Sequence, residues 1–325
     1  MYDVITVGSA TVDALVRTEF YETIHDKKKK ECIAYPMGSK ILMKELILTT
    51  GGGGTNTAVA LARLGHKVAF LGKVGSKYNS SRVINELKKE KVDTSLIIRS
   101  KTGRTGYSMV LDSKKHDRTI LAFKGSNNDL KFNEITLKKL RTKWFYFSTM
   151  MGESFRTLEK LADYASKNNI KIAFNISSYL AKKGKNYLKN VLNKTSILIL
   201  NKEEAGLLVG KGKISDLLKK LQKSGVEIIA ITDGKNGVYV LHDKIIYYGK
   251  PHNVKIVETT GAGDAFASSF LSGIIKKNDI EFAIDIGMIN AESVIQHHGA
   301  KEILLKYNEV LKAMKKRPRK IIKLS

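Results

Sequence analysis

Residues 257–270, VETTGAGDAFASSF, decide how the rest of the chain is interpreted. The first amides of a helix have no partner inside the helix, and the helix dipole adds partial positive charge there. Glycine lets an anion approach such a backbone closely. The segment therefore predicts an anion hole at Gly261, Ala262 and Gly263, with Asp264 beside it to accept a proton. An ordinary helix start, with its acid favoured by the dipole, is the alternative. The complete TTGAGD string before a helix of small residues favours the anion hole.

Short apolar runs alternate with amphipathic stretches on both sides of this segment. The apolar runs predict strands at residues 2–7, 67–71, 95–98, 144–148, 171–175, 196–200 and 227–232. The amphipathic stretches predict helices that include residues 58–64, 83–91, 154–166 and 214–223. Strands that are apolar throughout and alternate with helices indicate an α/β fold, with a mostly parallel sheet covered on both faces.

Two regions, at about residues 14–50 and 104–123, interrupt the alternation because they contain no clear helical pattern. The second region predicts paired strands at residues 107–112 and 118–123. Strands inserted into an α/β chain indicate a small secondary sheet that projects from the main body. No internal repeat and no proline-rich linker is visible, so we expect one domain over residues 1–325 with an inserted lid.

The composition narrows the class of protein. A single cysteine, Cys32, excludes an intramolecular disulfide framework. No apolar run approaches the roughly 18–20 residues that span a bilayer, and the first residues lack a basic leader, so we expect a cytoplasmic protein without a membrane partner.

The net charge is strongly positive, at +26 from 57 basic and 31 acidic residues. The lysines are spread along the chain, with runs at residues 27–30 and 313–323, and few aromatic residues lie among them. A surface that stacks nucleobases needs such aromatic residues. A solvated basic surface is therefore favoured over nucleic-acid binding, which stays open as the alternative.

Six collinear motifs resemble those of the ribokinase-like (PfkB) carbohydrate kinase family. ETTGAGDAF at residues 258–266 is similar to the second family signature, and GGGGTNTAVALARLG at residues 51–65 is similar to the first. GSATVD (8–13), GKVG (72–75), NKEE (201–204) and TDGKNG (232–237) follow in the family's order. The resemblance covers nearly the whole chain, and it implies a three-layer, Rossmann-like, mostly parallel sheet with a small β lid.

The resemblance also implies roles for the central residues. Asp264 would be the general base that activates an acceptor hydroxyl for in-line attack on the γ-phosphoryl group of ATP. Gly261, Ala262 and Gly263 would hold the charge on the transferred group, with Mg²⁺ as the metal.

The nucleotide would lie near two further motifs. Asn201 and Glu204 would organise water around Mg²⁺ and the phosphates, with a helix cap as the alternative for this pair. Thr232, Gly234 and Gly237 would line the nucleotide site, and a plain hairpin turn before residues 238–241 is equally compatible with them.

The acceptor would lie against Asp13, Gly52, Gly53 and Asn56. A carboxylate accepts hydrogen bonds and an amide can donate them, so Asp13 and Asn56 could together clamp vicinal hydroxyls. The alternative for Asp13 is a turn residue after the first strand. Lid residues near 105–108 would close over the acceptor and exclude water.

Departures from the family pattern limit the substrate. Glu258 replaces the usual aspartate, which puts a K⁺ site in doubt, and Met288 stands where members often carry Asn or His near the adenine. We cannot align Glu153 with the glutamate that contacts sugar in ribokinases, which weakens ribose as the substrate.

The expected function is ATP-dependent phosphorylation of a sugar hydroxyl, with a nucleoside as the alternative acceptor. A nucleobase usually binds by stacking on an aromatic ring, and few aromatic residues other than Tyr107 fall in the expected acceptor region. Phe20, Tyr21, Tyr35 and Phe123 could still reach it from the lid. The family also implies a homodimer formed through the lid.

Overall fold

The computed structural model describes residues 1–19, 21–27, 29, 31–76, 78–112, 118–297 and 299–324. Phe20, Lys28 and Lys30 therefore lie outside the described residues, as do residues 113–117 of the expected lid. No helix in the described ranges is long and apolar enough to cross a membrane.

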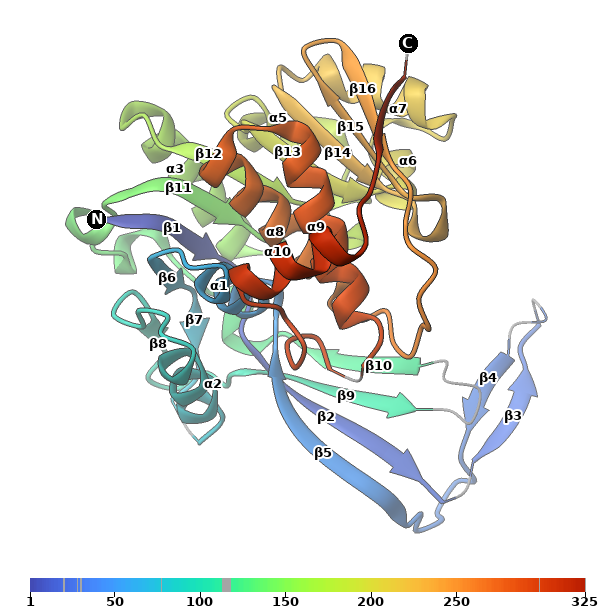
Figure 1. The fold of residues 1–325 in the computed structure, drawn as a ribbon. Coiled ribbons are helices and arrows are strands. Elements are labelled where there is room, and N and C mark those ends of the chain that lie inside the picture. The colour runs from blue at the N-terminus through green and yellow to red at the C-terminus, as the bar shows by residue number, and fades with distance from the viewer. Residues whose placement is uncertain are drawn as a thin grey trace.

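A nine-stranded sheet forms the centre of the described structure (Figure 1). Its strand order is β17-β16-β15-β14-β13-β12-β11-β1-β6. The strands are β1 (Tyr2–Val7), β6 (Val68–Leu71), β11 (Thr142–Phe147), β12 (Lys171–Asn175), β13 (Ile197–Asn201), β14 (Ile228–Thr232), β15 (Val238–His242), β16 (Ile245–Gly249) and β17 (Ile321–Leu324). The strands from β6 to β14 are parallel, and β15, β16 and β17 add an antiparallel edge.

Helices cover both faces of this sheet, because successive strand residues point to opposite faces and both sets are apolar. Ile5, Phe145 and Phe147 belong to one buried cluster, and Val4 and Tyr146 belong to the other. The first cluster is covered by α3 (Glu153–Lys167), α4 (Ser178–Ala181), α5 (Lys185–Leu192), α6 (Lys202–Val209) and α7 (Ile214–Gln222). The second is covered by α1 (Gly53–Arg63), α2 (Tyr78–Lys89), α8 (Ala262–Lys277) and α9 (Ile280–Val294), and α10 (Tyr307–Lys316) packs on α9. The predicted three-layer α/β fold is confirmed.

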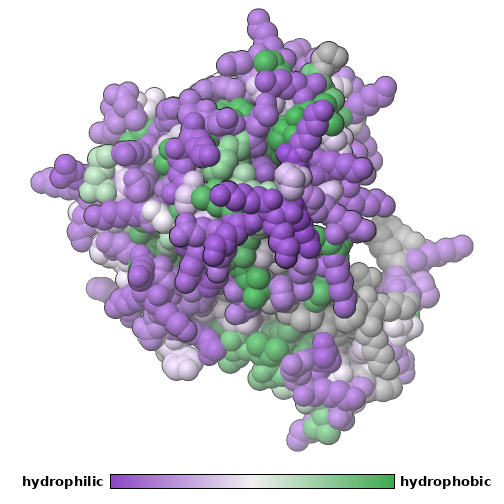
Figure 2. Space-filling view, in the orientation of Figure 1, coloured by the Kyte–Doolittle hydropathy of each residue, from purple (hydrophilic) through white to green (hydrophobic). Residues whose placement is uncertain are grey.

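A second sheet of four strands projects below the main body in Figure 1, and we call it the lid sheet. It consists of β2 (Thr11–Thr18), β5 (Met43–Gly51), β9 (Gly106–Asp112) and β10 (Arg118–Phe123), in the order β10-β9-β2-β5. The hairpin of β3 (Glu22–His25) and β4 (Glu31–Ala34) extends from it, and the short pair β7 (Lys73–Val74) and β8 (Ile98–Arg99) lies near α2. Apolar side chains gather over the lid strands in the lower part of Figure 2.

The predicted elements recur in the structure with a few differences. The strand predicted at residues 95–98 is wrong, because residues 95 and 96 form a turn and only Ile98–Arg99 pairs with β7. Helix α1 begins at Gly53, five residues before the predicted stretch, because the glycine-rich segment itself forms its first turn. Strand β17 was not predicted, since it is short, lies at the sheet edge and follows a strongly basic run.

Candidate active site

Helix α8 begins at the segment that the sequence singles out. Its N-cap is Gly261, with a φ of 84°, and a Cβ atom there would lie 2.6 Å from the Cα and Cβ atoms of Ala300. Both the backbone conformation and the close neighbour require glycine. Asp264 is thereby fixed in the first turn of the helix, next to residues 299–300.

The amides of this first turn are only partly open to a ligand. The N–H of Ala262 donates to the carbonyl oxygen of Thr259 at 3.2 Å. The N–H groups of Gly263 and Asp264 have no acceptor among the described residues, as expected for a first helical turn. A Cβ atom on Gly263 would meet nothing within 4 Å, so the space beside it is open. Of the three predicted amides, Gly263 is thus the one best placed to receive an anion.

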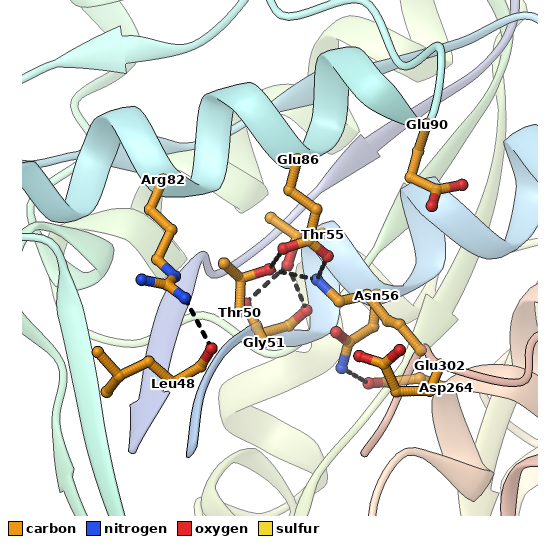
Figure 3. A network of polar contacts seen from close by, with 12 residues as sticks. Leu48, Thr50, Gly51, Thr55, Asn56, Arg82, Glu86, Glu90, Asp264 and Glu302 are labelled. Atoms are coloured by element: carbon orange, nitrogen blue, oxygen red, sulfur yellow. Dashed lines mark hydrogen bonds and ion pairs between the residues drawn. The ribbon is translucent and has the colours of Figure 1, made fainter. Parts of the chain in front are cut away.

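Helix α1 brings a partner to the Asp264 carboxylate. The side chain of Asn56 donates from Nδ2 to Oδ2 of Asp264 at 2.9 Å (Figure 3). Gly53, at the start of α1, lies so close that a Cβ atom on it would be 3.7 Å from Oδ1 of Asp264. Two of the predicted acceptor residues, Gly53 and Asn56, are therefore next to the predicted base.

The surroundings of Asp264 change its proton affinity. Burial raises the pKa of the Asp264 carboxyl to about 6, while the hydrogen bond from Asn56 and the positive charge of Lys301 oppose that rise. The residue keeps partial solvent exposure, so a ligand can reach it. A carboxylate with a pKa near neutrality is ionised at pH 7 and still takes up a proton readily, which suits a general base.

A cavity of about 390 Å³ lies between the lid sheet, α2 and residues 299–302, and we call it the acceptor cavity. Asp13 of β2 lines it and accepts a hydrogen bond from the Ser108 hydroxyl of β9. The Asp13 carboxylate packs against Gly51, where a Cβ atom would overlap its Oδ2. Gly52, with a φ of 105°, lies against the backbone of Ser9 and makes the turn into α1. The predicted acceptor residues thus lie around the junction of β5 and α1, but of the four only Asp13 lines the acceptor cavity.

Sequence reasoning missed Lys301, which is almost fully buried beside the same cavity. Its ammonium group forms an ion pair with Oε1 of Glu86 at 2.6 Å and donates to the Thr50 hydroxyl at 2.6 Å. Glu86 also accepts from Thr50, and Arg82 donates to the carbonyl oxygen of Leu48 at 2.8 Å (Figure 3). No sequence pattern singles out Lys301 among the 57 basic residues.

A second cavity, of about 500 Å³, lies on the other side of the helix start, and we call it the nucleotide cavity. Thr232, Gly234 and Gly237 line it, from the turn between the antiparallel strands β14 and β15. Ala262 and Gly263 of α8 and Met288 of α9 also line it. The predicted nucleotide residues 232, 234 and 237 therefore share one cavity with two of the three residues of the predicted anion hole, 262 and 263.

Asn201 and Glu204 do not line either cavity. They form a reciprocal capping box at the start of α6, in which Asn201 Oδ1 accepts from the Glu204 amide at 2.8 Å and Glu204 Oε2 accepts from the Asn201 amide at 2.9 Å. Burial raises the pKa of Glu204, and hydrogen bonds from backbone amides oppose the rise. The helix-cap alternative is thus realised, and a role of this pair toward Mg²⁺ stays a prediction.

The expected metal at this site is Mg²⁺, bound together with the phosphates of a nucleotide. Within the described residues, no group of three or more His, Cys, Asp and Glu side chains could hold a metal ion. Mg²⁺ usually keeps several waters and binds through one or two carboxylates together with substrate phosphates. Such a Mg²⁺ ion would arrive with a nucleotide, and a water-mediated role of Glu204 toward it stays a prediction.

Comparison with known proteins identifies the class. Among solved structures, a nucleoside kinase of Methanocaldococcus jannaschii, an archaeal member of the ribokinase family, superposes with a TM-score of 0.80 at 22% identity, covering 97% of this chain and 99% of that one. The fold is therefore that of the ribokinase family. The chain matches the pfkB family carbohydrate kinases over residues 21–306, and it belongs to that family.

Two curated relatives show the range of names in the family. An uncharacterized sugar kinase of Archaeoglobus fulgidus is 30% identical over 249 residues, which cover 75% of this chain and 97% of the relative. A 5-dehydro-2-deoxygluconokinase of Clostridium tetani is 28% identical over 288 residues, covering 82% of this chain and 84% of the relative. The protein is accordingly a sugar or nucleoside kinase. Kinases of this family use ATP, generally with Mg²⁺.

Proposed function

We propose that the protein transfers the γ-phosphoryl group of ATP to a hydroxyl group of a sugar, with Asp264 as the general base. One observation carries this proposal: consecutive residues line different cavities, Thr259 the nucleotide cavity and Thr260 the acceptor cavity. The start of α8 therefore separates the two cavities, and Asp264 lies in its first turn. Asp264 is not itself among the lining residues of either cavity, and we propose that a donor and an acceptor bound on the two sides meet next to its carboxylate.

The chain's own groups divide the work of the reaction. When bound, the nucleotide supplies the phosphoryl group, and Mg²⁺ neutralises negative charge on its phosphates. Asp264 takes the proton from the acceptor hydroxyl at a carboxylate oxygen, and the hydrogen bond from Asn56 to Oδ2 fixes the orientation of that carboxylate. The free amide of Gly263 donates to a phosphate oxygen, as amides at helix starts do. Asn201 and Glu204 would act on Mg²⁺ only through water, since Asn201 Oδ1 and Glu204 Oε2 already accept the hydrogen bonds of the helix cap.

The lining of the acceptor cavity favours a sugar over a nucleoside. No aromatic ring lines it in the described part of the chain; Tyr21, Tyr35, Tyr107 and Phe123 are not among its lining residues, and Phe20 lies outside the described residues. A base without a stacking face would lose much of its binding energy. The ionisable residues of the lining can instead bond hydroxyl groups; they are Asp13, Arg82, Glu86, Glu258, Lys301 and Glu302.

Glu258 stands where the family usually has the aspartate that helps to build a K⁺ site. Its Oε2 accepts from the Gly299 amide at 2.9 Å and thereby ties the segment before α8 to residues 299–302. One carboxylate oxygen is thus engaged by the protein itself. We therefore propose activity without an absolute need for K⁺.

The lid sheet suggests how the chain would assemble. We propose that residues 1–325 act as one kinase domain and that two copies pair through their lid sheets. Large apolar side chains that are exposed on the lid support this; they are Leu46, Ile47, Leu48, Met109, Ile120, Leu121 and Phe123. An exposed apolar patch of this kind commonly marks an interface. Light scattering coupled to size exclusion would find a dimer, and a monomer at micromolar concentration would contradict the pairing.

The function is tested by a phosphorylation screen. Sugars, sugar acids and nucleosides are incubated with ATP and Mg²⁺, with and without K⁺, and the products are detected by mass spectrometry. We expect a phosphorylated sugar and little phosphorylated nucleoside. Turnover of nucleosides alone would replace the sugar by the alternative acceptor. No turnover, together with DNA or RNA binding that weakens steeply with salt, would favour the nucleic-acid alternative.

A further inference from the structure

One wall of the nucleotide cavity is a segment without regular secondary structure. Residues 251–256 lie between β16 and α8 and form neither helix nor strand. Five of these residues line the cavity, namely Pro251, His252, Asn253, Val254 and Ile256. A segment without a hydrogen-bonded ladder keeps one conformation only where other groups hold it, because ordering a free backbone costs entropy. The position of this wall therefore depends on the contacts at its two ends.

Helix α9 and its C-cap provide a contact at each end of the segment. At the end near α8, the amides of Val257 and Glu258 donate to the carbonyl oxygen of Ile295 at 2.8 and 3.1 Å. At the end near β16, the amide of His252 donates to Oε1 of Glu292 at 2.9 Å. The first contact is made by the backbone, whereas the second is made by a side chain. The wall is therefore fixed near β16 only as firmly as the Glu292 side chain is.

Arg319 holds that side chain and the neighbouring backbone. Its Nη2 donates to Oε1 of Glu292 at 2.9 Å, and its Nη1 donates to the carbonyl oxygen of Lys250. Its Nε donates to Oδ1 of Asp285, which also lies on α9, at 3.0 Å. The Arg319 side chain is only 2% exposed. One buried guanidinium group therefore joins the start of the irregular segment to α9.

The C-terminal strand places Arg319 in this position. β17 pairs with β16 so that Ile321 lies opposite Gly249, and Figure 1 shows this strand running beside β16. Arg319, two residues before Ile321, thereby comes next to the residue that follows Gly249. Arg319 and β17 both lie beyond residue 306, where the match to the kinase family ends. The contact is therefore made by a segment that the family match does not include.

The contact needs an arginine, because both carboxylates are nearly buried and lie in different directions. Burial raises the pKa of Asp285, and the hydrogen bond and charge of Arg319 oppose the rise. Lysine would keep the charge but not the planar set of N–H donors. Nδ1 of His252 lies 2.9 Å from Nη2 of Arg319 and 2.8 Å from Oε2 of Glu292. The bonds to the His252 amide and the Lys250 carbonyl involve the backbone, so they hold whichever ring nitrogen carries a proton.

We propose that Arg319 is a positioning residue for the nucleotide, which acts by holding residues 250–252 against α9. The wall formed by residues 251–256 is then in place before the nucleotide binds. Arg319 itself is not among the residues that line the nucleotide cavity, so it acts only through this wall. A ligand that finds its site already ordered binds more tightly, because it does not have to order the site itself. This inference rests on the assignment of the cavity to a nucleotide in the proposed function.

Calorimetric titration of Arg319→Lys with Mg²⁺–ATP, well below the melting temperature of the protein, tests this. We expect the Kd for ATP to be about 5–20-fold higher than in the wild type, because the nucleotide must now order the wall as it binds. A Kd within about twofold of the wild-type value would overturn the inference and leave the proposed function standing. A wild-type protein that does not bind ATP would remove the assignment of the cavity to a nucleotide, and the inference with it.

Hydrogen exchange of the nucleotide-free protein gives a readout that a general loss of stability would not produce. The amides of His252, Val257 and Glu258 are hydrogen-bonded in the wild type. In Arg319→Lys the peptide that covers residues 252–258 should exchange several-fold faster, while the peptide that covers β14 keeps its wild-type rate, because only the wall opens. Equal acceleration of both peptides would assign Arg319 to overall stability alone and contradict the inference.

A second variant serves if Arg319→Lys does not fold. The double variant of Asp285→Asn and Arg319→Gln loses one positive and one negative charge together, so it leaves less uncompensated charge in the interior. The same rise in Kd and the same local exchange are expected from it, and wild-type values of both would overturn the inference.

Two further variants control for charge and for lost stability. Arg317→Gln removes a charge from the same segment, and Arg317 is exposed and does not line the nucleotide cavity. Arg63→Lys removes a guanidinium group that bonds Glu90 and backbone carbonyl oxygens of residues 301–304, away from the nucleotide cavity. We expect the wild-type Kd for ATP in both, with a lower melting temperature in Arg63→Lys. ATP binding that weakens in either control as much as in Arg319→Lys would rule out a specific role of Arg319.

Discussion

The two cavities beside Asp264 are built in different ways. The nucleotide cavity is lined mostly by backbone turns and apolar side chains, and its ionisable lining residues are Lys235, His252 and Glu292. The acceptor cavity is smaller, at about 390 Å³ against 500 Å³, and six ionisable residues line it. Backbone amides recognise a phosphate whatever it is attached to, whereas directed side chains select a particular pattern of hydroxyls. The proposed donor side would thus be general and the proposed acceptor side specific.

The difference follows from which elements supply each cavity. The nucleotide cavity uses the main sheet, α8 and α9, which form one packed body. The acceptor cavity uses β2, β5, β9 and β10 of the lid sheet together with α2 and residues 299–302. Changes in the lid sheet should therefore alter acceptor binding and leave nucleotide binding intact. Single substitutions in each cavity can test the two kinds of binding separately.

The largest expected effect is at the proposed base, Asp264, in the first turn of α8. Asp264→Asn should lower kcat by about 10²–10⁴-fold, because the positioned base is lost. In the wild type the pKa of Asp264 is raised to about 6, so the folded protein binds this proton more tightly than the unfolded chain. Asp264 therefore reduces stability as pH rises from about 4 to 6, and the variant should be more stable at pH 8, by on the order of 1–3 kcal/mol.

Activity assays and thermal unfolding at pH 4 and pH 8 check this pair of results. The stability gain should shrink toward pH 4, where the folded wild type holds the proton and the unfolded chain, with the ordinary aspartate pKa of 3.8, begins to bind it. A variant with near-normal kcat would remove the base assignment.

The next effect is confined to the donor side. Gly263→Ala should fold normally, because its Cβ atom would meet nothing within 4 Å, but it narrows the space at the free amide. We expect the KM for ATP to rise by about 10–100-fold with the acceptor KM unchanged. The matched variant Gly261→Ala should instead lower the melting temperature, since its φ is 84° and Ala300 is in the way. Steady-state kinetics and melting curves distinguish the two, and a wild-type KM for ATP in Gly263→Ala would argue against an anion at this amide.

The corresponding effect on the acceptor side is expected from Asp13→Asn. The variant keeps its shape but loses the charge that strengthens hydrogen bonds to hydroxyls, so the acceptor KM should rise by about 10–50-fold. The KM for ATP should not change. Glu22→Gln, on the exposed strand β3, is the control and should match the wild type in both constants. An equal rise in both KM values in Asp13→Asn would mean that the two cavities are not independent.

The acidity of Asp264 predicts a smaller, continuous effect. Since a pKa of about 6 governs the base, kcat/KM should fall by about tenfold between pH 7 and pH 5. Removal of the nearby positive charge in Lys301→Met should move this acid limb to higher pH, because that charge lowers the pKa of Asp264. A pH–rate profile of both proteins measures the shift, and an acid limb near pH 4 in the wild type would contradict the effect of burial.

The smallest effect is expected behind the site. Tyr146 of β11 is fully buried, its hydroxyl has no hydrogen-bond partner in the described part of the chain, and burial raises its pKa. Tyr146→Phe keeps the ring and removes an unpaired polar group, so the free energy of unfolding should stay the same or rise by about 1 kcal/mol. Denaturant unfolding measures it, and a loss of more than about 1 kcal/mol would show that the hydroxyl is bonded in solution.

Much of this site could be predicted because its elements are local. The anion hole needs only a glycine-rich turn before a helix, and residues 257–270 carry both. The strands of the parallel sheet could also be predicted, because each is a short apolar run in the sequence. The motif at residues 201–204 is also local, but its residue types suit a helix cap and a metal site equally well. Only the three-dimensional structure shows that they form the cap.

The sequence alone determined the strands of the parallel sheet, the start of α8 and the place of Asp264 on it. Only the tertiary structure decided the partners of that carboxylate, since Asn56 reaches it from 208 residues away and Lys301 binds Thr50 across 251 residues. The same holds for Arg319, which meets Glu292 and His252 only because β17 joins the sheet edge. A backbone turn is specified by neighbouring residues, whereas a contact between distant side chains exists only once the layers have packed around one sheet.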